Sequence, residues 1–239
     1  MKFLKIIIKI KNLLRSKIWF IGLINNIAAN IELENLIKDI KFNTVLDIGS
    51  NKGQFILLLE NFFKDVEIYS FEPIKEILEK QKKFFMFKKN IHFFNVGLGQ
   101  EIEKKNFYIT KRKDSSSFLK SNISINSDYQ INDNREIQIE TLDNLLLNQN
   151  LKSPILAKID VQGYELKVLK GADILLKKIK YLIVEVSEDQ LYINQPISTE
   201  IINFLKERNF IVLKENLPTK IRNSNSIQKD ILFLNQLID

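Results

Sequence analysis

The residues best suited to ligand binding form a short glycine turn, Asp47-Ile-Gly-Ser-Asn-Lys-Gly53. An apolar run precedes the turn and helical spacing follows it, so the turn joins a strand to a helix. Glycine lets a ligand approach the backbone closely, and open α/β sheets bind ligands at the carboxyl ends of their strands. The spacing G-x-x-x-G differs from the dinucleotide fingerprint G-x-G-x-x-G. The candidate binding residues here are Asp47, Gly49, Asn51 and Gly53.

A second candidate is Glu72, which ends the next strand-like run, 19 residues after Gly53. An acid at this distance from a glycine turn can hydrogen-bond the hydroxyls of a ribose. Because enzymes that bind nicotinamide dinucleotides use the same position, Glu72 indicates an adenosine-containing ligand without selecting one. The alternative interpretation is a solvent-facing acid that precedes a turn at Pro73.

A third candidate is the polar stretch Lys158-Ile-Asp-Val-Gln-Gly-Tyr-Glu165. Asp160 and Gln162 follow an apolar run and are expected at the mouth of the same crevice. A carboxylate there could accept a proton from a reacting group or orient a ligand, and the sequence leaves both roles open for Asp160. Glu165 is a second catalytic candidate, or an acid favoured by the dipole of a helix that begins there.

Alternating strand-like and helix-like runs must position these stretches. This order predicts an α/β fold with a doubly wound, mostly parallel sheet and helices on both faces. The strand before Asp160 is expected beside the strand before the glycine turn, so that the candidates meet. Runs at 210–213 and 231–234 have no helix between them, which predicts a hairpin with an antiparallel last strand. The other predicted strands are 44–48, 66–71, 91–96, 155–161 and 181–186, and the predicted helices are 31–40, 53–63, 74–87, 164–176 and 198–208.

The alternation breaks between residues 99 and 150. Short strand-like runs at 106–110 and 136–140 flank a polar stretch rich in Ser, Asn and Asp. Such a long excursion from a compact domain is usually a functional lid or a mobile loop. The whole pattern predicts a basic helical arm at 1–40 and one α/β domain at 41–239.

The composition narrows the chemistry further. A chain of 239 residues, 45% of them hydrophobic, suits one domain with a small appendage. The absence of cysteine excludes thiolate nucleophiles, disulfides and cysteine-ligated zinc, and it fits a cytoplasmic location. His92 is the only histidine, so multi-histidine metal sites are excluded and no metal site is predicted. Because His92 lies near the amino end of its strand, away from the expected ligand edge, we interpret it as structural.

Positive charge is concentrated at the N-terminus. Six Lys and Arg residues precede Glu32, the first acidic residue, so a net charge of +7 leaves 7 − 6 = +1 for the rest. A nucleic-acid surface across the domain is therefore not indicated. Lysines interrupt the apolar residues of segment 1–27, which fits neither a membrane span nor a signal peptide. The segment is either a helix packed on the domain or a basic amphipathic helix on the inner face of a membrane.

Five blocks of this sequence resemble the FkbM-type methyltransferases. They follow the family's order over roughly residues 43–190, and the run 158–172 is the most specific of them. The resemblance implies a Rossmann-like methyltransferase fold and S-adenosylmethionine as the cofactor. It further implies O-methylation of a hydroxyl on a sugar, glycan, polyketide or other secondary metabolite. The blocks are 45–55, 69–73, 95–98, 158–172 and, in the following strand, 184–185.

The resemblance also implies roles for the candidates. Glu72 would hold the ribose, and Asp160 would lie beside the methyl group being transferred. A methyl group on sulfur transfers in line to a nucleophilic oxygen, so the protein must chiefly align donor and acceptor. The residues that would shape the methionine end of the site are Asp47, Gly49 and Gly53, and those that would border the adenine are Val96, Gly97 and Leu98.

Two features of the sequence bear on the acceptor side. Family members commonly have Glu where this chain has Gln162, so a carboxylate role there would move to Asp160 or Glu165. The stretch 114–118 resembles a Ser-rich segment before the family's acceptor region. That resemblance makes Ser115 to Ser117 candidates for an acceptor pocket or lid, and the alternative is a plain polar loop.

Two other classes of function stay open on the sequence. A nucleotide- or dinucleotide-binding oxidoreductase could use the same crevice, although the missing G-x-G-x-x-G weighs against it. A non-catalytic protein recruited to a membrane through segment 1–27 would also carry the basic arm. The sequence identifies neither the hydroxyl-bearing acceptor, a small molecule or a glycan, nor the oligomeric state.

Overall fold

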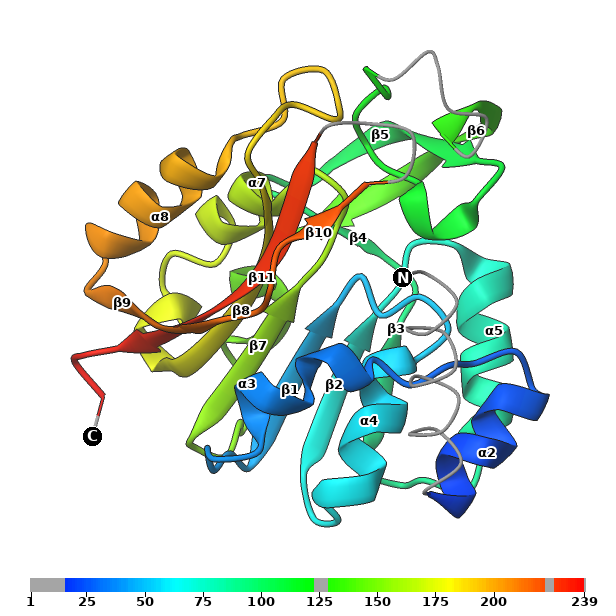
Figure 1. Cartoon of the computed structure of the whole chain (residues 1–239), viewed down its shortest axis with the longest axis vertical. Helices are drawn as coiled ribbons and strands as arrows, with labels where there is room; N and C mark the ends of the chain where they lie inside the picture. The colour runs from blue at the N-terminus through cyan, green and yellow to red at the C-terminus, as the bar shows by residue number, and fades with distance from the viewer. Residues whose placement is uncertain (1–15, 123–128, 222–225, 239) are drawn as a thin grey trace.

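The computed structural model describes residues 16–122, 129–221 and 226–238, and a sheet of eight strands lies at its centre. The strands are β1 (Thr44–Ile48), β2 (Glu67–Phe71), β3 (Ile91–Phe94), β7 (Ile155–Ile159), β8 (Ile179–Ser187), β9 (Phe210–Glu215), β10 (Thr219–Lys220) and β11 (Ile227–Asn235). Their order is β10-β11-β8-β7-β1-β2-β3, with β9 also beside β11 (Figure 1). Strands β1, β2, β3, β7 and β8 run parallel, so the predicted mostly parallel sheet is confirmed, and β7 lies beside β1 as expected.

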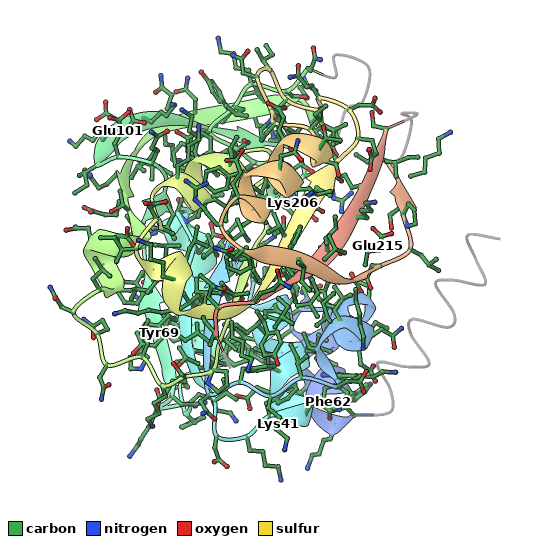
Figure 2. The ribbon with its side chains drawn as sticks, turned by 90° about the vertical axis from the view of Figure 1, so that its left-hand side faces the viewer. Lys41, Phe62, Tyr69, Glu101, Lys206 and Glu215 are labelled. Carbon is green, nitrogen blue, oxygen red and sulfur yellow. The ribbon has the colours of Figure 1, made fainter. Side chains whose placement is uncertain are left out.

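The central strands β1, β2, β7 and β8 are buried on both faces because their alternate side chains enter different cores. The covering helices are α2 (Lys17–Ile24), α3 (Glu34–Ile37), α4 (Gln54–Phe62), α6 (Leu142–Leu146), α7 (Glu165–Lys170), η4 (Leu175–Lys178) and α8 (Ser198–Lys206). Leu46 and Ile48 of β1 pack in a core with α6, α7, η4 and α8, whereas Val45 packs in a core with α2, α3 and α4. Side chains fill both layers (Figure 2). A strand buried on both faces reads as a nearly continuous apolar run, which made β1 recognisable.

The predicted helix 164–176 is interrupted. α7 ends at Lys170, and the short η4 follows it as a separate turn. A Cβ at Gly171 would lie 1.9 Å from the carbonyl oxygen of Gly99, so the two backbones touch at this point. The close approach of another segment ends α7 where the apolar spacing alone predicts that it continues.

The antiparallel last strand of the prediction is confirmed. β11 lies between β8 and β9 and runs antiparallel to both. In the pairing with β8, Asp230 is the direct partner of Glu185. Two carboxylates from different parts of the chain therefore meet in the interior of the sheet.

The excursion at 99–150 is mostly a second, smaller sheet. Its strands are β4 (Gly97–Leu98), β5 (Glu103–Thr110) and β6 (Ile131–Glu140), in the order β4-β6-β5. The predicted strands at 106–110 and 136–140 are parts of the longer β5 and β6. Phe107 and Phe118 pack with Ile77 of α5 (Lys75–Phe84), which holds the small sheet beside the main one (Figure 1). Residues 123–128 of the excursion lie outside the described part.

The described part of the arm is docked on the domain. Trp19 of α2 is buried and donates a hydrogen bond from Nε1 to the Leu57 carbonyl of α4 at 2.9 Å. The interpretation of a packed helix therefore holds for α2, while residues 1–15 lie outside the described residues. No helix within the described ranges has the length and apolar character needed to cross a bilayer.

Candidate active site

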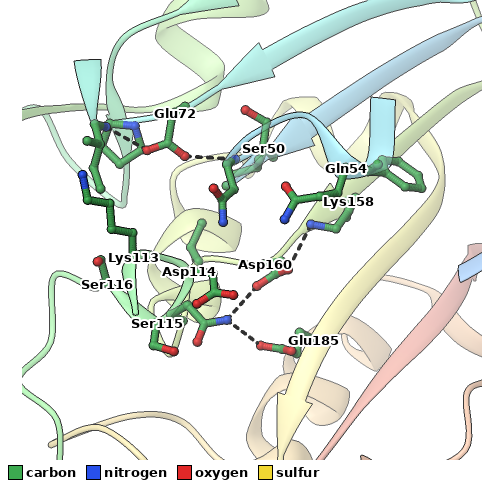
Figure 3. A pocket seen from close by; sticks show the side chains of 18 of the residues that line it. Ser50, Gln54, Glu72, Lys113, Asp114, Ser115, Ser116, Lys158, Asp160 and Glu185 are labelled. Atoms are coloured by element: carbon green, nitrogen blue, oxygen red, sulfur yellow. Dashed lines mark hydrogen bonds and ion pairs between the residues drawn. The ribbon is translucent and has the colours of Figure 1, made fainter. Parts of the chain in front are cut away.

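A cavity of about 530 Å³ opens at the carboxyl edge of the main sheet, and the smaller sheet contributes Gly97, Leu98 and Phe107 to its wall; Figure 3 shows part of the lining. Its volume falls within the range of roughly 300–1,000 Å³ found for small-molecule sites. All three candidate stretches reach it. The predicted site residues that line it are Gly49, Asn51, Glu72, Val96, Gly97, Leu98 and Asp160, whereas Asp47, Gly53 and Glu165 lie behind its wall.

The glycine turn is shaped by two left-handed glycines. Gly49 has φ +76°, and a Cβ there would lie 1.9 Å from the carbonyl oxygen of Asp160. Gly53 has φ +84° and packs against Phe85 and Gln81, on the side away from the cavity. Gly49 therefore lets the loops after β1 and β7 touch, while Gly53 sets the start of α4.

Glu72 joins the turn to the loop after β2. Its Oε2 accepts the N–H of Asn51 at 3.0 Å, and its Oε1 accepts the N–H of Ile74 at 2.8 Å. Burial raises the pKa of Glu72 to about 7, although these two hydrogen bonds oppose the shift. Each oxygen keeps a second lone pair, so the carboxylate can still accept hydrogen bonds from hydroxyls of a ligand.

Lys158 lines the cavity and forms a buried pair with Asp47 behind the cavity wall. They are direct partners in the pairing of β1 with β7, and Lys158 Nζ lies 3.8 Å from Asp47 Oδ1. In the described part of the chain, neither carboxylate oxygen of Asp47 has a hydrogen-bond partner. Burial raises the pKa of Asp47 to about 6, against the opposing effect of Lys158. Burial alone would lower the pKa of Lys158, but Asp160 and Asp47 together raise it.

Asp160 belongs to a chain of polar contacts along the cavity wall. Its Oδ2 accepts from Lys158 Nζ at 3.1 Å, and its Oδ1 accepts from the Gln162 amide at 2.9 Å. The same amide nitrogen donates to Glu185 Oε2 at 3.0 Å (Figure 3). Tyr192 donates its hydroxyl proton to Gln162 Oε1 at 3.1 Å. Gln162 therefore connects two carboxylates that face the cavity.

Glu165 holds the loop that carries Gln162. Its Oε1 accepts the N–H groups of Val161 at 3.1 Å and Gly163 at 3.0 Å. Burial raises the pKa of Glu165 to about 7 against these hydrogen bonds. Gln162 itself has φ +56°, a conformation that costs a non-glycine residue about 1–3 kcal/mol and needs such support. The contacts of Glu165 are positioning contacts, and its catalytic role stays a prediction.

The wall expected to border an adenine is apolar and rigid. Val96 and Leu98 are buried, and a Cβ at Gly97 would lie 2.3 Å from the Phe118 ring. Phe118 thus closes this wall from the smaller sheet. Ser115 and Ser116 of the excursion also line the cavity. The hydroxyl of Ser117 donates a hydrogen bond to the Gln162 carbonyl at 2.7 Å.

The far side of the cavity was not predicted. Sequence reasoning missed Glu185 as a site residue, because Val184–Glu185 stood out only as part of a resembling strand. It also missed the contributions of β11 and the arm to the cavity lining, because these residues belong to no recognisable sequence motif. His92 lies outside the cavity, exposed beside Glu67 at 3.1 Å, in agreement with a structural role. The unpredicted lining residues include Ala28, Asn30, Glu32, Glu185, Gln228 and Asp230.

The residues present fit a bound S-adenosylmethionine. Gly49, Ser50 and Asn51 of the glycine turn line the cavity, and so does Glu72. Asn51 lines the cavity, and its Oδ1 has no hydrogen-bond partner among the described residues. With the parallel sheet and its antiparallel last strand, these features define the Rossmann-like methyltransferase class, whose cofactor is S-adenosylmethionine.

The chain matches the Methyltransferase FkbM domain over residues 47–212 and belongs to that family. The hexuronic acid methyltransferase AglP of Haloferax volcanii is 29% identical over 105 residues, which cover 40% of this chain and 44% of that relative. The chain thus aligns with less than half of the relative's length.

Solved structures resemble the chain at low sequence identity. TrmK of M. capricolum, in complex with S-adenosyl-homocysteine, is 11% identical, with 87% of this chain and 69% of that chain covered and a TM-score of 0.49. Magnesium protoporphyrin IX methyltransferase of Synechocystis PCC 6803, with bound S-adenosylmethionine, is 10% identical, with 95% and 82% covered and a TM-score of 0.47.

Proposed function

We propose that this protein methylates a hydroxyl oxygen of a sugar or glycan, with S-adenosylmethionine as the methyl donor. The observation that carries the proposal is the single cavity that joins the glycine turn and Glu72 to the carboxylates of Asp160 and Glu185. One part of the cavity suits an adenosine, and the other offers carboxylates beside the expected position of the acceptor. Membership of the FkbM family supports the same reaction.

In this proposal the residues around the cavity have separate roles in binding the cofactor and in positioning the acceptor. S-adenosylmethionine, when bound, supplies a methyl group on a positively charged sulfur. Glu72 accepts the ribose hydroxyls, and the walls at Val96 and Leu98 enclose the adenine. Asp160, held by its ion pair with Lys158, places a carboxylate near the positively charged sulfur and orients the cofactor. The rigid loops around these residues hold donor and acceptor in line, which is the main catalytic requirement.

The sugar acceptor is supported by the lining and by one relative. The side of the cavity away from Glu72 carries amide and carboxylate groups from Gln54, Gln228 and Asp230. Such groups suit the many hydroxyls of a sugar, because each can pair with one or two of them. AglP of Haloferax volcanii, which matches part of this chain, is a hexuronic acid methyltransferase. We include uronic acids among the proposed acceptors.

The test combines cofactor binding with transfer. Calorimetry with S-adenosylhomocysteine and, separately, with NAD distinguishes this function from an oxidoreductase of the same fold. Labelled S-adenosylmethionine is then incubated with methyl glycosides of neutral, amino and uronic sugars. Glu72→Ala is expected to weaken S-adenosylhomocysteine binding, whereas Asp160→Ala mainly slows transfer. Unchanged binding and unchanged rate in both variants would contradict the assignment of the site.

We also propose a peripheral membrane contact through the arm. On the outer side of α2, Phe20, Ile21 and Ile24 are 44%, 42% and 65% exposed. They follow a segment with six positive charges and no acidic residue, which suits an anionic membrane surface. Deletion of residues 1–15 keeps the buried Trp19 in place and is expected to abolish co-sedimentation with phosphatidylglycerol vesicles. Ile174→Ser, at an exposed side chain just before η4 on the opposite face of the sheet, is the control.

A further inference from the structure

Two half-buried carboxylates lie side by side in the wall of the cavity. Glu185 of β8 and Asp230 of β11 are direct partners in the antiparallel pairing, and both line the cavity. Like charges directly opposite each other on neighbouring strands are destabilising. Repulsion between the two negative charges favours binding of a proton by one of the carboxylates. The fold therefore keeps a proton acceptor in the wall of the cavity.

The surroundings of Glu185 differ from those of Asp160. Asp160 has a direct ion pair with Lys158, which fixes its negative charge. Glu185 accepts only amide N–H groups, from Gln162 at 3.0 Å and Gln228 at 3.2 Å, and no salt bridge reaches it within the described residues. A carboxylate without a cation partner can take up and release a proton at lower free-energy cost than one locked in an ion pair.

We infer that Glu185 is the catalytic base, which accepts the proton of the acceptor hydroxyl, and that Asp160 is the fixed charge beside it. This inference rests on the proposed methyl transfer to a hydroxyl. Gln162 then acts as a positioning residue, because its amide joins the two carboxylates without adding a third negative charge.

The step balances as follows. The hydroxyl oxygen forms a new bond to the methyl carbon with one of its lone pairs. The bond between that carbon and the donor sulfur breaks, and its electron pair goes to the sulfur, which becomes neutral. The hydroxyl proton passes to an Oε atom of Glu185, which becomes a neutral carboxylic acid and later releases the proton to water.

The electrostatics support this assignment. Burial raises the pKa of the Glu185 carboxyl well above its ordinary range, and Asp160 and Asp230 raise it further. A general base works best when its pKa lies near the working pH. Burial likewise raises the pKa of Asp230 to about 6. The other groups that act on the charge of Glu185, or are acted on by it, are Lys158, Glu165, Tyr129 and Tyr192.

The experiment compares Glu185→Gln with Asp160→Asn in the full chain. The acceptors are the methyl glycosides of glucose, glucosamine and glucuronic acid, and calorimetry with S-adenosylhomocysteine verifies that each variant binds cofactor. Glu185→Gln is expected to lower kcat/KM about 100-fold or more. It should also remove the rise of kcat/KM with pH that the wild type shows as its base loses a proton. Glu188→Gln, at the end of the same strand but outside the cavity lining, is the matched control with wild-type kinetics.

The possible results separate the two proposals. If wild-type protein binds cofactor but methylates none of the acceptors, the sugar acceptor and the inference that rests on it are both overturned. If Glu185→Gln retains the wild-type rate and pH profile, only the assignment of the base is overturned. Loss of the pH-dependent rise in Asp160→Asn, with its retention in Glu185→Gln, would assign the base to Asp160.

Discussion

The two sides of the cavity are built in different ways. The cofactor side comes from three short loops, each directly after a parallel strand, with Gly49, Glu72 and Val96 as their landmarks. The acceptor side is assembled from the arm, the excursion, β8, β10 and β11, which are distant in the sequence. The first side is set by local turns, whereas the second exists only when remote segments pack together. The cofactor side therefore tolerates sequence changes elsewhere in the chain. Substitutions in the remote segments can change which acceptor binds without disturbing the cofactor side.

Lys158 pairs with Asp47 below the glycine turn and with Asp160, which Gln162 joins to Glu185 on the acceptor side, so its removal is expected to have the largest effect. Lys158→Met leaves Asp47 and Asp160 without their cation partner, and breaking a buried ion pair from one side costs about 3–5 kcal/mol. Urea denaturation at pH 8 measures the free energy of unfolding. Lys229→Met, which removes two partly exposed ion pairs, to Glu188 and Glu215, should cost less, about 1 kcal/mol. Equal stabilities of the two variants would mean that the buried pair does not hold the sides together.

Glu165 stabilises the loop between the two sides in a pH-dependent way. Its raised pKa of about 7 means that its contribution to stability is complete below its ordinary value of 4.5 and is lost as pH rises through 7. One pKa unit corresponds to about 1.4 kcal/mol, so this group alone lowers the free energy of unfolding by about 3 kcal/mol between pH 4.5 and pH 8. Glu165→Gln should flatten that dependence, and the exposed Glu101→Gln should leave it unchanged. A wild-type slope in Glu165→Gln would contradict the prediction.

Glu72 gives the cofactor side its own pH dependence. Ligand hydroxyls pair best with the ionised carboxylate, whose pKa in the free protein is about 7. The ionised fraction, and with it the affinity for S-adenosylhomocysteine, should rise about tenfold from pH 6 to pH 8. Calorimetry across this range measures the Kd. In Glu72→Gln the dependence should disappear, and a tenfold rise that persists there would assign it to another group.

Substitutions in the Ser-rich stretch 115–117 test whether acceptor binding can be weakened without a change in cofactor binding. Replacement of Ser115, Ser116 and Ser117 by alanine removes two hydroxyls from the lining and the hydrogen bond to Gln162. It also removes the acceptors of two backbone N–H groups, those of Thr110 and Leu119. The KM for the acceptor is expected to rise about tenfold, as for the loss of one or two hydrogen bonds, while the Kd for S-adenosylhomocysteine stays within about twofold. Unchanged acceptor kinetics would remove this stretch from the acceptor site.

The sequence predicts the cofactor side of the cavity better than the acceptor side. The glycine turn, Glu72 and Asp160 could be found because each stands directly after an apolar run, and the position of a strand end is a local property. The sheet and its antiparallel last strand were predicted for the same reason. Glu185 and Asp230 could not be found in this way, because a polar residue within a strand normally faces water. Their position side by side in the cavity wall follows from the pairing of β8 with β11, which no local pattern encodes. The interruption of the helix at Gly171 likewise depends on contact with remote Gly99.

The position of β11 also bears on synthesis of the protein by the ribosome. β11 follows β8 and β9 in the chain but lies between them in the sheet. While residues 227–235 are still in the exit tunnel, the edge of β8 has no partner and β9 cannot join the sheet. The nascent chain can therefore assemble the cofactor side early, whereas the acceptor side waits for β11. Until then the free edge of β8 is open to pairing with a strand of another chain.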